Sequence, residues 1–302
     1  MRTLKTSEAA TFLNVSPNTL RSWERRFGFP RPMRSPGQHR LYTYGDITAL
    51  RDALLAGLSI SSAMGVAQEG LRSGTNALLG ALAAFDGVAA DEVMESTLSL
   101  RSIERSVEDV LLRAMDHVID RHGHDSAPAA FAARWGGDWL RRALRLAYTP
   151  DQRATVVIGD ASRDEFDPDA VYIRALELVC ARSGPVPLCL PVRGLGAMTH
   201  AVSATTPTAL VIAGRHADDD QVARWAYAVR SVAGALPVAL YRRRSETARA
   251  HPSSARVLAA SPLAAQQQLV ETIAAERATD RDERRTAAAS RAHFAPVRQA
   301  AV

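Results

Sequence analysis

Residues 20–42 read LRSWERRFGFPRPMRSPGQHRLY. Leu20, Trp23 and Phe27 recur at the spacing of one face of a helix, so we expect them to pack against a neighbouring element. Gly28 is typical of a helix end, and the three prolines that follow prevent the helix from resuming. The residues beyond the prolines are typical of two short strands joined by a turn. The stretch therefore predicts a helix with a basic outer side, followed by a small strand pair.

Another helix is predicted just before this one. Thr6 or Ser7 can cap it, and Glu8 in its first turn suits the helix dipole. After a tight turn, Ser16 can cap the second helix, with Pro17 at its first position, where no backbone N–H is needed. Two short helices joined by a tight turn form a helix-turn-helix, whose second helix reads the major groove of DNA.

The segment resembles the winged helix-turn-helix DNA-binding domain of MerR-type transcription regulators. The resemblance covers about residues 3–72 and depends on the order and spacing of SEAATFLNVSPNTLRSWERRFGFPRPMRSPGQHRLYTYGDI. It implies that the second helix enters the major groove and that the wing approaches the DNA backbone or the minor groove. One helix, a turn at Gly57 and a further helix are expected to complete the domain.

The residues themselves indicate which side chains face DNA. Outward positions on the second helix can reach bases or phosphates, whereas wing residues suit contacts with phosphate and sugar. Trp23 and Phe27 could stack on bases, but their helical spacing favours core packing. We predict DNA contacts from Asn18, Thr19, Arg21, Ser22, Arg25, Arg26, Gln38, His39, Arg40 and Tyr42.

The net charge of +5 belongs to the N-terminal quarter of the chain. Residues 1–74 hold ten Lys and Arg against five Asp and Glu, and the remaining residues hold 27 of each. A basic segment is either the footprint of nucleic-acid binding or a solvated surface. Together with the helix-turn-helix, the charge favours double-stranded DNA as the partner.

Length and composition indicate the class of protein. The 302 residues predict two or three domains, and 47% hydrophobic residues are ordinary for a soluble globular chain. We expect no membrane span and no signal peptide, because the chain has no apolar run of the required length. Cys180 and Cys189 lie in apolar stretches and are expected to be buried, which favours a cytoplasmic, nucleoid-associated location.

The rest of the chain predicts three further segments. Residues 72–80 are predicted to be a linker, and no long heptad helix is expected after the winged domain. Residues 76–148 carry the apolar spacing of a four-helix bundle. From 153 to 276, strands and helices alternate five times, which is typical of a Rossmann-like, doubly wound parallel sheet. Residues 278–302 are charged and are expected to be disordered. The predicted fold class is therefore multidomain α and α/β, beginning with the winged helix of residues 1–72.

This domain order resembles the CarH/LitR group of light-sensing MerR-like regulators, which implies an adenosylcobalamin site between bundle and sheet. In that group an Asp/Glu-x-His-x-x-Gly loop after the first strand ligates cobalt. The corresponding loop, GDASRDEFDPDA, has no histidine. The bundle's Glu-His pair aligns with Ala133 and Arg134, and YRRRSE replaces the Gly-Gly after the fourth strand. We therefore predict no cofactor and expect no cobalamin in the usual mode.

The sequence leaves the role of the C-terminal module open. It could serve in homo-oligomerisation or in binding another protein, with a dimer or higher oligomer on repeated half-sites and repression favoured by analogy. Alternatively, it could sense another small ligand in the crevice between bundle and sheet. The candidate crevice residues are His122, Trp135, Trp139, Asp160 and Arg163.

Catalysis and metal binding are the weakest interpretations of the sequence. Asp160, Asp164 and Glu165 could act as acids at a strand end, but no nucleophile–base pair accompanies them, so we predict no enzyme. Three histidines lie near the end of a predicted helix, at 117, 122 and 124, but without the spacing of ligands. We therefore predict no metal site.

Overall fold

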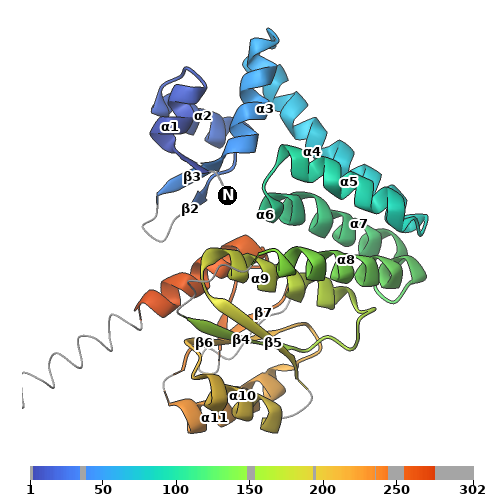
Figure 1. Ribbon diagram of the computed structural model, residues 1–302, viewed down its shortest axis with the longest axis vertical. Coiled ribbons are helices and arrows are strands. Elements are labelled where there is room, and N and C mark those ends of the chain that lie inside the picture. The colour runs from blue at the N-terminus through green and yellow to red at the C-terminus, as the bar shows by residue number, and fades with distance from the viewer. Residues whose placement is uncertain are drawn as a thin grey trace, which may run out of the picture.

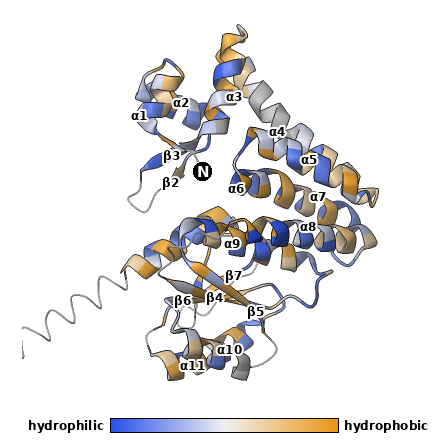
Figure 2. Cartoon of the chain, in the orientation of Figure 1, coloured by the Kyte–Doolittle hydropathy of each residue, from blue (hydrophilic) through white to orange (hydrophobic). Residues whose placement is uncertain are grey.

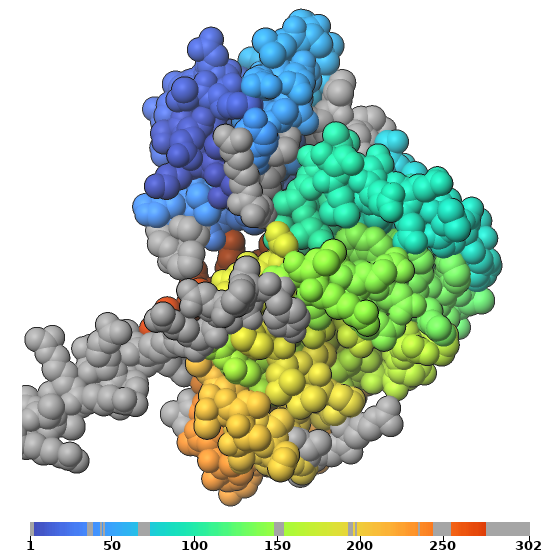
Figure 3. Space-filling view, in the orientation of Figure 1, coloured from blue at the N-terminus to red at the C-terminus, as the bar shows by residue number. Residues whose placement is uncertain are grey.

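The computed structural model describes residues 3–34, 39–147, 154–192, 195–234, 236–243 and 255–275. In chain order it contains a small N-terminal unit, a layer of helices and an α/β domain, stacked along the long axis (Figure 1). The N-terminal unit projects from the rest of the molecule (Figure 3). The described residues contain no helix long and apolar enough to cross a membrane.

The N-terminal unit combines three helices with a three-stranded antiparallel sheet of order β1-β3-β2. As predicted, Ser16 caps the second helix, and Gly28 ends it in the left-handed conformation at φ 65°. The predicted cap of the first helix is wrong: the helix begins after Lys5, whose backbone N–H donates to the Glu8 carboxylate at 2.7 Å. The elements are β1 (Thr3–Lys5), α1 (Thr6–Phe12), α2 (Pro17–Phe27), β2 (Met33–Arg34), β3 (Arg40–Thr43) and α3 (Tyr44–Leu55).

The predicted linker is instead part of a helix. Residues 72–80 lie inside α4 (Ile60–Ala83), a 24-residue helix that leads from the N-terminal unit into the bundle. Glycines at 70, 74 and 80 weaken the local preference for helix, which made the segment read as a linker. Tertiary packing overrides that preference, because Leu78 and Leu82 are completely buried in the core of the bundle.

The four-helix bundle predicted from apolar spacing is present. α4 packs on the segments that follow it, and the third of the four is a continuous run that includes one π-helical turn. The bundle core is continuous with one face of the sheet domain, in a single buried cluster. The segments are α5 (Gly87–Leu100), α6 (Ile103–Ser106), η1 (Val107–Leu111), α7 (Leu112–His122) and α8 (Ala127–Arg145).

The C-terminal domain is the predicted doubly wound sheet, with five parallel strands in the order β5-β4-β6-β7-β8. Helix α9 (Pro168–Ser183) and the helical residues 262–275 cover the face toward the bundle. α10 (Leu195–Thr205) and α11 (Asp219–Ala233) cover the other (Figure 1). The strands are β4 (Thr155–Asp160), β5 (Val186–Pro191), β6 (Ala209–Ala213), β7 (Val238–Tyr241) and β8 (Arg256–Val257).

Side-chain alternation along the strands explains the two layers. Val156 and Ile158 of β4 belong to the core shared with the bundle, whereas Val157 belongs to the core beneath α10 and α11. The strands of this sheet are largely hydrophobic, as expected of strands buried on both faces (Figure 2). α8 and α9 approach closely at Gly136, where an added Cβ would lie 3.4 Å from the side chain of Val171. The bundle and the sheet domain are therefore in direct contact at this position.

Candidate functional site

The outer face of α2 is polar and basic. Leu20 and Trp23 are buried and Phe27 is half-buried, which confirms that this apolar side packs inward. The Thr19 hydroxyl is half-buried and forms a 2.7 Å hydrogen bond with that of Ser16, at the start of the helix. The other predicted DNA-contacting residues of the helix are all exposed: Asn18, Arg21, Ser22, Arg25 and Arg26.

The wing is joined to α2 through Glu24, a residue that no sequence pattern marks as functional. Its carboxylate accepts hydrogen bonds from the Arg40 guanidinium at 3.1 Å and from the Tyr42 hydroxyl at 3.3 Å. Burial, followed by the nearby Glu24 carboxylate, raises the pKa of Tyr42. The predicted DNA contact by Tyr42 is wrong, because Tyr42 is completely buried. His39 is exposed, and Gln38 lies outside the described residues.

The N-terminal segment also matches a known protein family. Residues 5–42 match the family described as "MerR family regulatory protein". They form a MerR family helix-turn-helix domain. The match ends at Tyr42, the residue that completes the contact between wing and α2.

Two curated relatives match shorter stretches of the chain, of 67 and 45 residues. The "HTH-type transcriptional repressor CarA" of Myxococcus xanthus is 40% identical over 67 residues, which are 20% of this chain and 23% of that protein. The "HTH-type transcriptional regulator MlrA" of Escherichia coli (strain K12) is 42% identical over 45 residues, 15% of this chain and 18% of that protein. The chain thus spans about a quarter or less of the curated relatives it matches.

A solved structure is similar to the larger part of the chain. It is described as a novel cobalamin-binding protein from Desulfitobacterium hafniense DCB-2. The similarity covers 66% of this chain and 98% of that one, at 13% sequence identity and a TM-score of 0.35.

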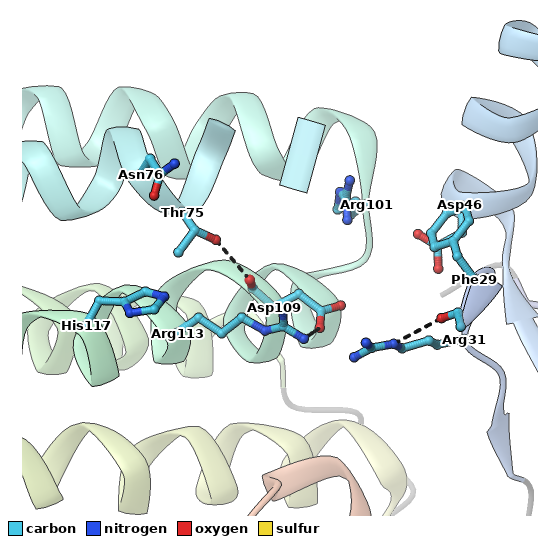
Figure 4. Close-up of a pocket in the computed structure, with 10 residues that line it drawn as sticks. Phe29, Arg31, Asp46, Thr75, Asn76, Arg101, Asp109, Arg113 and His117 are labelled. Carbon is cyan, nitrogen blue, oxygen red and sulfur yellow. Dashed lines mark hydrogen bonds and ion pairs between the residues drawn. The ribbon is translucent and has the colours of Figure 1, made fainter. Parts of the chain in front are cut away.

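Two hydrogen bonds to backbone carbonyls connect the MerR domain to the rest of the chain. Arg105 of α6 donates a 2.7 Å hydrogen bond to the carbonyl oxygen of Arg31, and Gln267 donates one of 2.9 Å to the carbonyl oxygen of Arg34. Beside the first contact lies a cavity of about 330 Å³. Figure 4 shows its lining, with Phe29, Arg31 and Asp46 from the MerR domain facing Thr75, Asn76, Arg101, Asp109, Arg113 and His117.

The candidate crevice residues do not converge on one cavity. Trp135 and Trp139 are only 8% and 7% exposed and belong to the bundle core. His122 is exposed at the end of α7. Asp160 accepts a 2.6 Å hydrogen bond from the hydroxyl of Ser162. Arg163 alone of the five lines a cavity of about 190 Å³ between the α7–α8 loop and the β4–α9 loop.

The space between bundle and sheet is filled where β7 ends. The Arg243 guanidinium lies 2.9 Å from the Asp116 carboxylate and 3.3 Å from that of Glu108, and it stacks 5.4 Å from the ring centre of Tyr172. The cavity remaining beside it measures about 10 Å³. Arg242 is likewise paired with Asp219, at 3.3 Å.

The loop after β4 does not match the corrinoid motif. Counting from Asp160 as its acid, the histidine position holds Ser162 and the glycine position holds Glu165. The Ser162 hydroxyl is engaged with Asp160. In the bundle, Ala133 is buried, and Arg134 forms an ion pair with Glu165 at 3.6 Å. The residues present therefore do not fit cobalamin coordination by this motif.

A second cluster lies at the carboxyl edge of the sheet, where ligands of such sheets bind. The side-chain oxygens of Asp167 and Asp169 and a ring nitrogen of His124 lie within 4.8 Å of one another. His216 Nε2 is 2.9 Å from Asp167, and the Arg215 guanidinium is 2.8 Å from His124 Nδ1. Burial raises the pKa of the Asp169 carboxyl. Sequence spacing did not reveal the cluster, because its histidines lie on different loops.

Proposed function

We propose that the chain is a cytoplasmic, sequence-specific DNA-binding transcription regulator. The observation that carries this proposal is the MerR family helix-turn-helix with an outer face of exposed Arg21, Arg25 and Arg26 on α2. That face has the charge and the shape for the major groove. Repression is favoured over activation because the relative matched over the longest segment is a repressor.

The proposed assembly is a homo-oligomer on repeated half-sites. A single helix-turn-helix covers too few base pairs for useful specificity, so such domains act in pairs. The bundle and sheet domain, which together make up most of the chain, are the natural scaffold for self-association or for a protein partner. Light scattering after size exclusion measures the oligomeric state directly.

The C-terminal module is proposed to act without cobalamin bound in the usual mode. Ser162 cannot replace the cobalt-ligating histidine, and Arg243 fills the space between bundle and sheet at the end of β7. Titration of the full chain with adenosylcobalamin in the dark, followed by visible spectroscopy, tests this. Stoichiometric binding would overturn it. A second candidate role, sensing of another small ligand, is supported by the cavity of about 190 Å³ lined by Arg163.

The DNA-binding proposal is tested with variants of α2. We expect Arg21→Ala and Arg25→Ala each to weaken binding to a selected site by about tenfold, because each removes a direct contact. Loss of a phosphate contact also lowers the salt slope by about 0.9. The control is Arg121→Ala, which removes an exposed arginine from the bundle and should leave affinity unchanged. Unchanged affinity in both α2 variants would show that this face does not bind DNA.

A further inference from the structure

The cluster at the sheet edge contains a buried nitrogen without a hydrogen-bond partner. Within the described part of the chain, His124 Nε2 forms no hydrogen bond, although the side chain is only 15% exposed. It lies 3.4 Å from Asp167 Oδ1, beyond the usual range of an N–H···O hydrogen bond. Two ligands of a tetrahedral zinc, each about 2.0–2.1 Å from the metal, are about 3.3 Å apart. The spacing therefore suits a shared metal better than a direct bond.

We propose that His124, Asp167 and Asp169 bind one zinc ion at the boundary between bundle and sheet. One imidazole nitrogen and two carboxylates supply three protein ligands, and the set is of the kind that divalent transition metals take. The fourth position opens beside the cavity of about 190 Å³, which His124 and Asp167 also line. The proposal does not depend on DNA binding.

The surroundings of the three residues are those of supported metal ligands. Asp125 Oδ1 lies 3.1 Å from His124 Nδ1, so it can accept the proton on that nitrogen and orient the ring. His216 Nε2 lies 2.9 Å from Asp167 Oδ2, but within the described part of the chain it forms no hydrogen bond, as is also true of His124 Nε2. The carboxylates of Asp167 and Asp169 accept hydrogen bonds from backbone N–H groups. Each carboxylate oxygen has two lone pairs, so it can still bind a metal ion.

The charges of the cluster are consistent with the same site. Asp167 and Asp169 place two carboxylates close together, beside His124. A divalent ion offsets the repulsion between the carboxylates. When His124 Nε2 ligates a metal, His124 Nδ1 must carry the proton. The Arg215 guanidinium now contacts Nδ1, and because it is itself a donor, it has to move away. Arg215 is an exposed residue, which makes this movement inexpensive.

The test is metal binding by the full chain without a polyhistidine tag. After treatment with a chelator, the protein is titrated with Zn²⁺ in competition with a chromophoric chelator. We expect one equivalent bound, at least 100-fold weaker binding in His124→Ala, and 10–100-fold weaker binding in Asp125→Asn. His122→Ala, which changes an exposed histidine two residues away, should bind as the unaltered chain does. Mg²⁺ should not compete, because it prefers oxygen ligands.

Two results would overturn the site. One is the absence of stoichiometric Zn²⁺ uptake at micromolar concentration, which would leave the cluster an ion-pair network. The other is uptake that His124→Ala does not change. Far-ultraviolet circular dichroism verifies that His124→Ala is folded. If His124→Ala is unfolded, the zinc affinity of Asp125→Asn decides the question. The Asp125 side chain is 77% exposed, so replacing it should leave the fold intact.

Discussion

Arg105 in the bundle donates a 2.7 Å hydrogen bond to the main-chain carbonyl of Arg31 in the MerR domain. The Arg105 side chain is only 9% exposed, and its guanidinium also lies 3.7 Å from the Asp109 carboxylate. Gln267, far along the chain, makes a parallel contact with the carbonyl of Arg34. Residues 31–34 are thus bonded to the bundle through Arg105 and to the C-terminal domain through Gln267, which links the placement of the wing to both.

Replacing Arg105 should loosen this link. Arg105→Met removes a buried cation from Asp109 and leaves the Arg31 carbonyl without its donor, so we expect the free energy of unfolding to fall by about 3 kcal/mol. Calorimetry should also show the MerR domain melting separately from the rest. The control is Arg113→Ala, since Arg113 pairs with the same carboxylate but is 44% exposed, and it should cost less than about 1 kcal/mol. Equal losses of stability in Arg105→Met and Arg113→Ala would show that Arg105 does not link the MerR domain to the bundle.

Tyr42 should matter for stability and not for DNA. Tyr42→Phe removes the hydroxyl that donates to Glu24 but keeps the buried ring, so we expect a loss of about 1 kcal/mol in chemical denaturation. DNA affinity, measured by fluorescence anisotropy, should remain within twofold. A loss of DNA affinity as large as that of Arg21→Ala would instead show that Tyr42 contributes to DNA binding.

Local signals explain how much of the fold the sequence predicts. Ser16 and Gly28 mark the ends of α2 by rules that need no tertiary information, and the short apolar runs of the sheet read directly as buried strands. The linker prediction failed because glycines in α4 lower its intrinsic helix preference, while the packing of Leu78 and Leu82 is a tertiary effect.

The site residues that were missed depend on contacts between distant segments. Arg243 and Glu108 are 135 residues apart, and nothing in either local sequence marks the pair. Glu24 looked like one charge on an amphipathic helix, yet it binds Arg40 and Tyr42 across the unit. Periodicity indicates which side of a helix is polar, but not which polar side chains are already engaged within the protein.

The buried thiol of Cys180 predicts a loss of stability at alkaline pH, whereas Cys189, also expected to be buried, is only half-buried. Burial raises the pKa of Cys180 from 9.0 to about 12, so the folded chain retains a proton that the unfolded chain releases. The contribution of Cys180 to the free energy of unfolding is therefore fully present below pH 9. It is lost as the pH rises toward the pKa of about 12 in the folded chain. Between pH 8 and 10 the unaltered chain should lose about 1.4 kcal/mol more than Cys180→Ala. Urea unfolding of both chains at pH 8 and pH 10 measures this difference. Equal losses of stability in the unaltered chain and in Cys180→Ala would contradict the prediction.

Arg243 connects the end of β7 to the bundle. Its side chain is only 10% exposed and contacts the carboxylates of Glu108 and Asp116. Arg243→Met keeps much of the volume but removes the Arg243 cation from both carboxylates, so we expect the free energy of unfolding to fall by 3–5 kcal/mol, about the cost of breaking a buried pair. Arg142→Ala is the control, because the Arg142 side chain is 60% exposed in its pair with Asp91 and should change stability by less than about 1 kcal/mol. The double variant Arg243→Met with Glu108→Gln should recover part of the loss, because it removes one stranded charge. If Arg243→Met proves as stable as Arg142→Ala, the guanidinium does not hold bundle and sheet together, and the closed space beside it needs another cause.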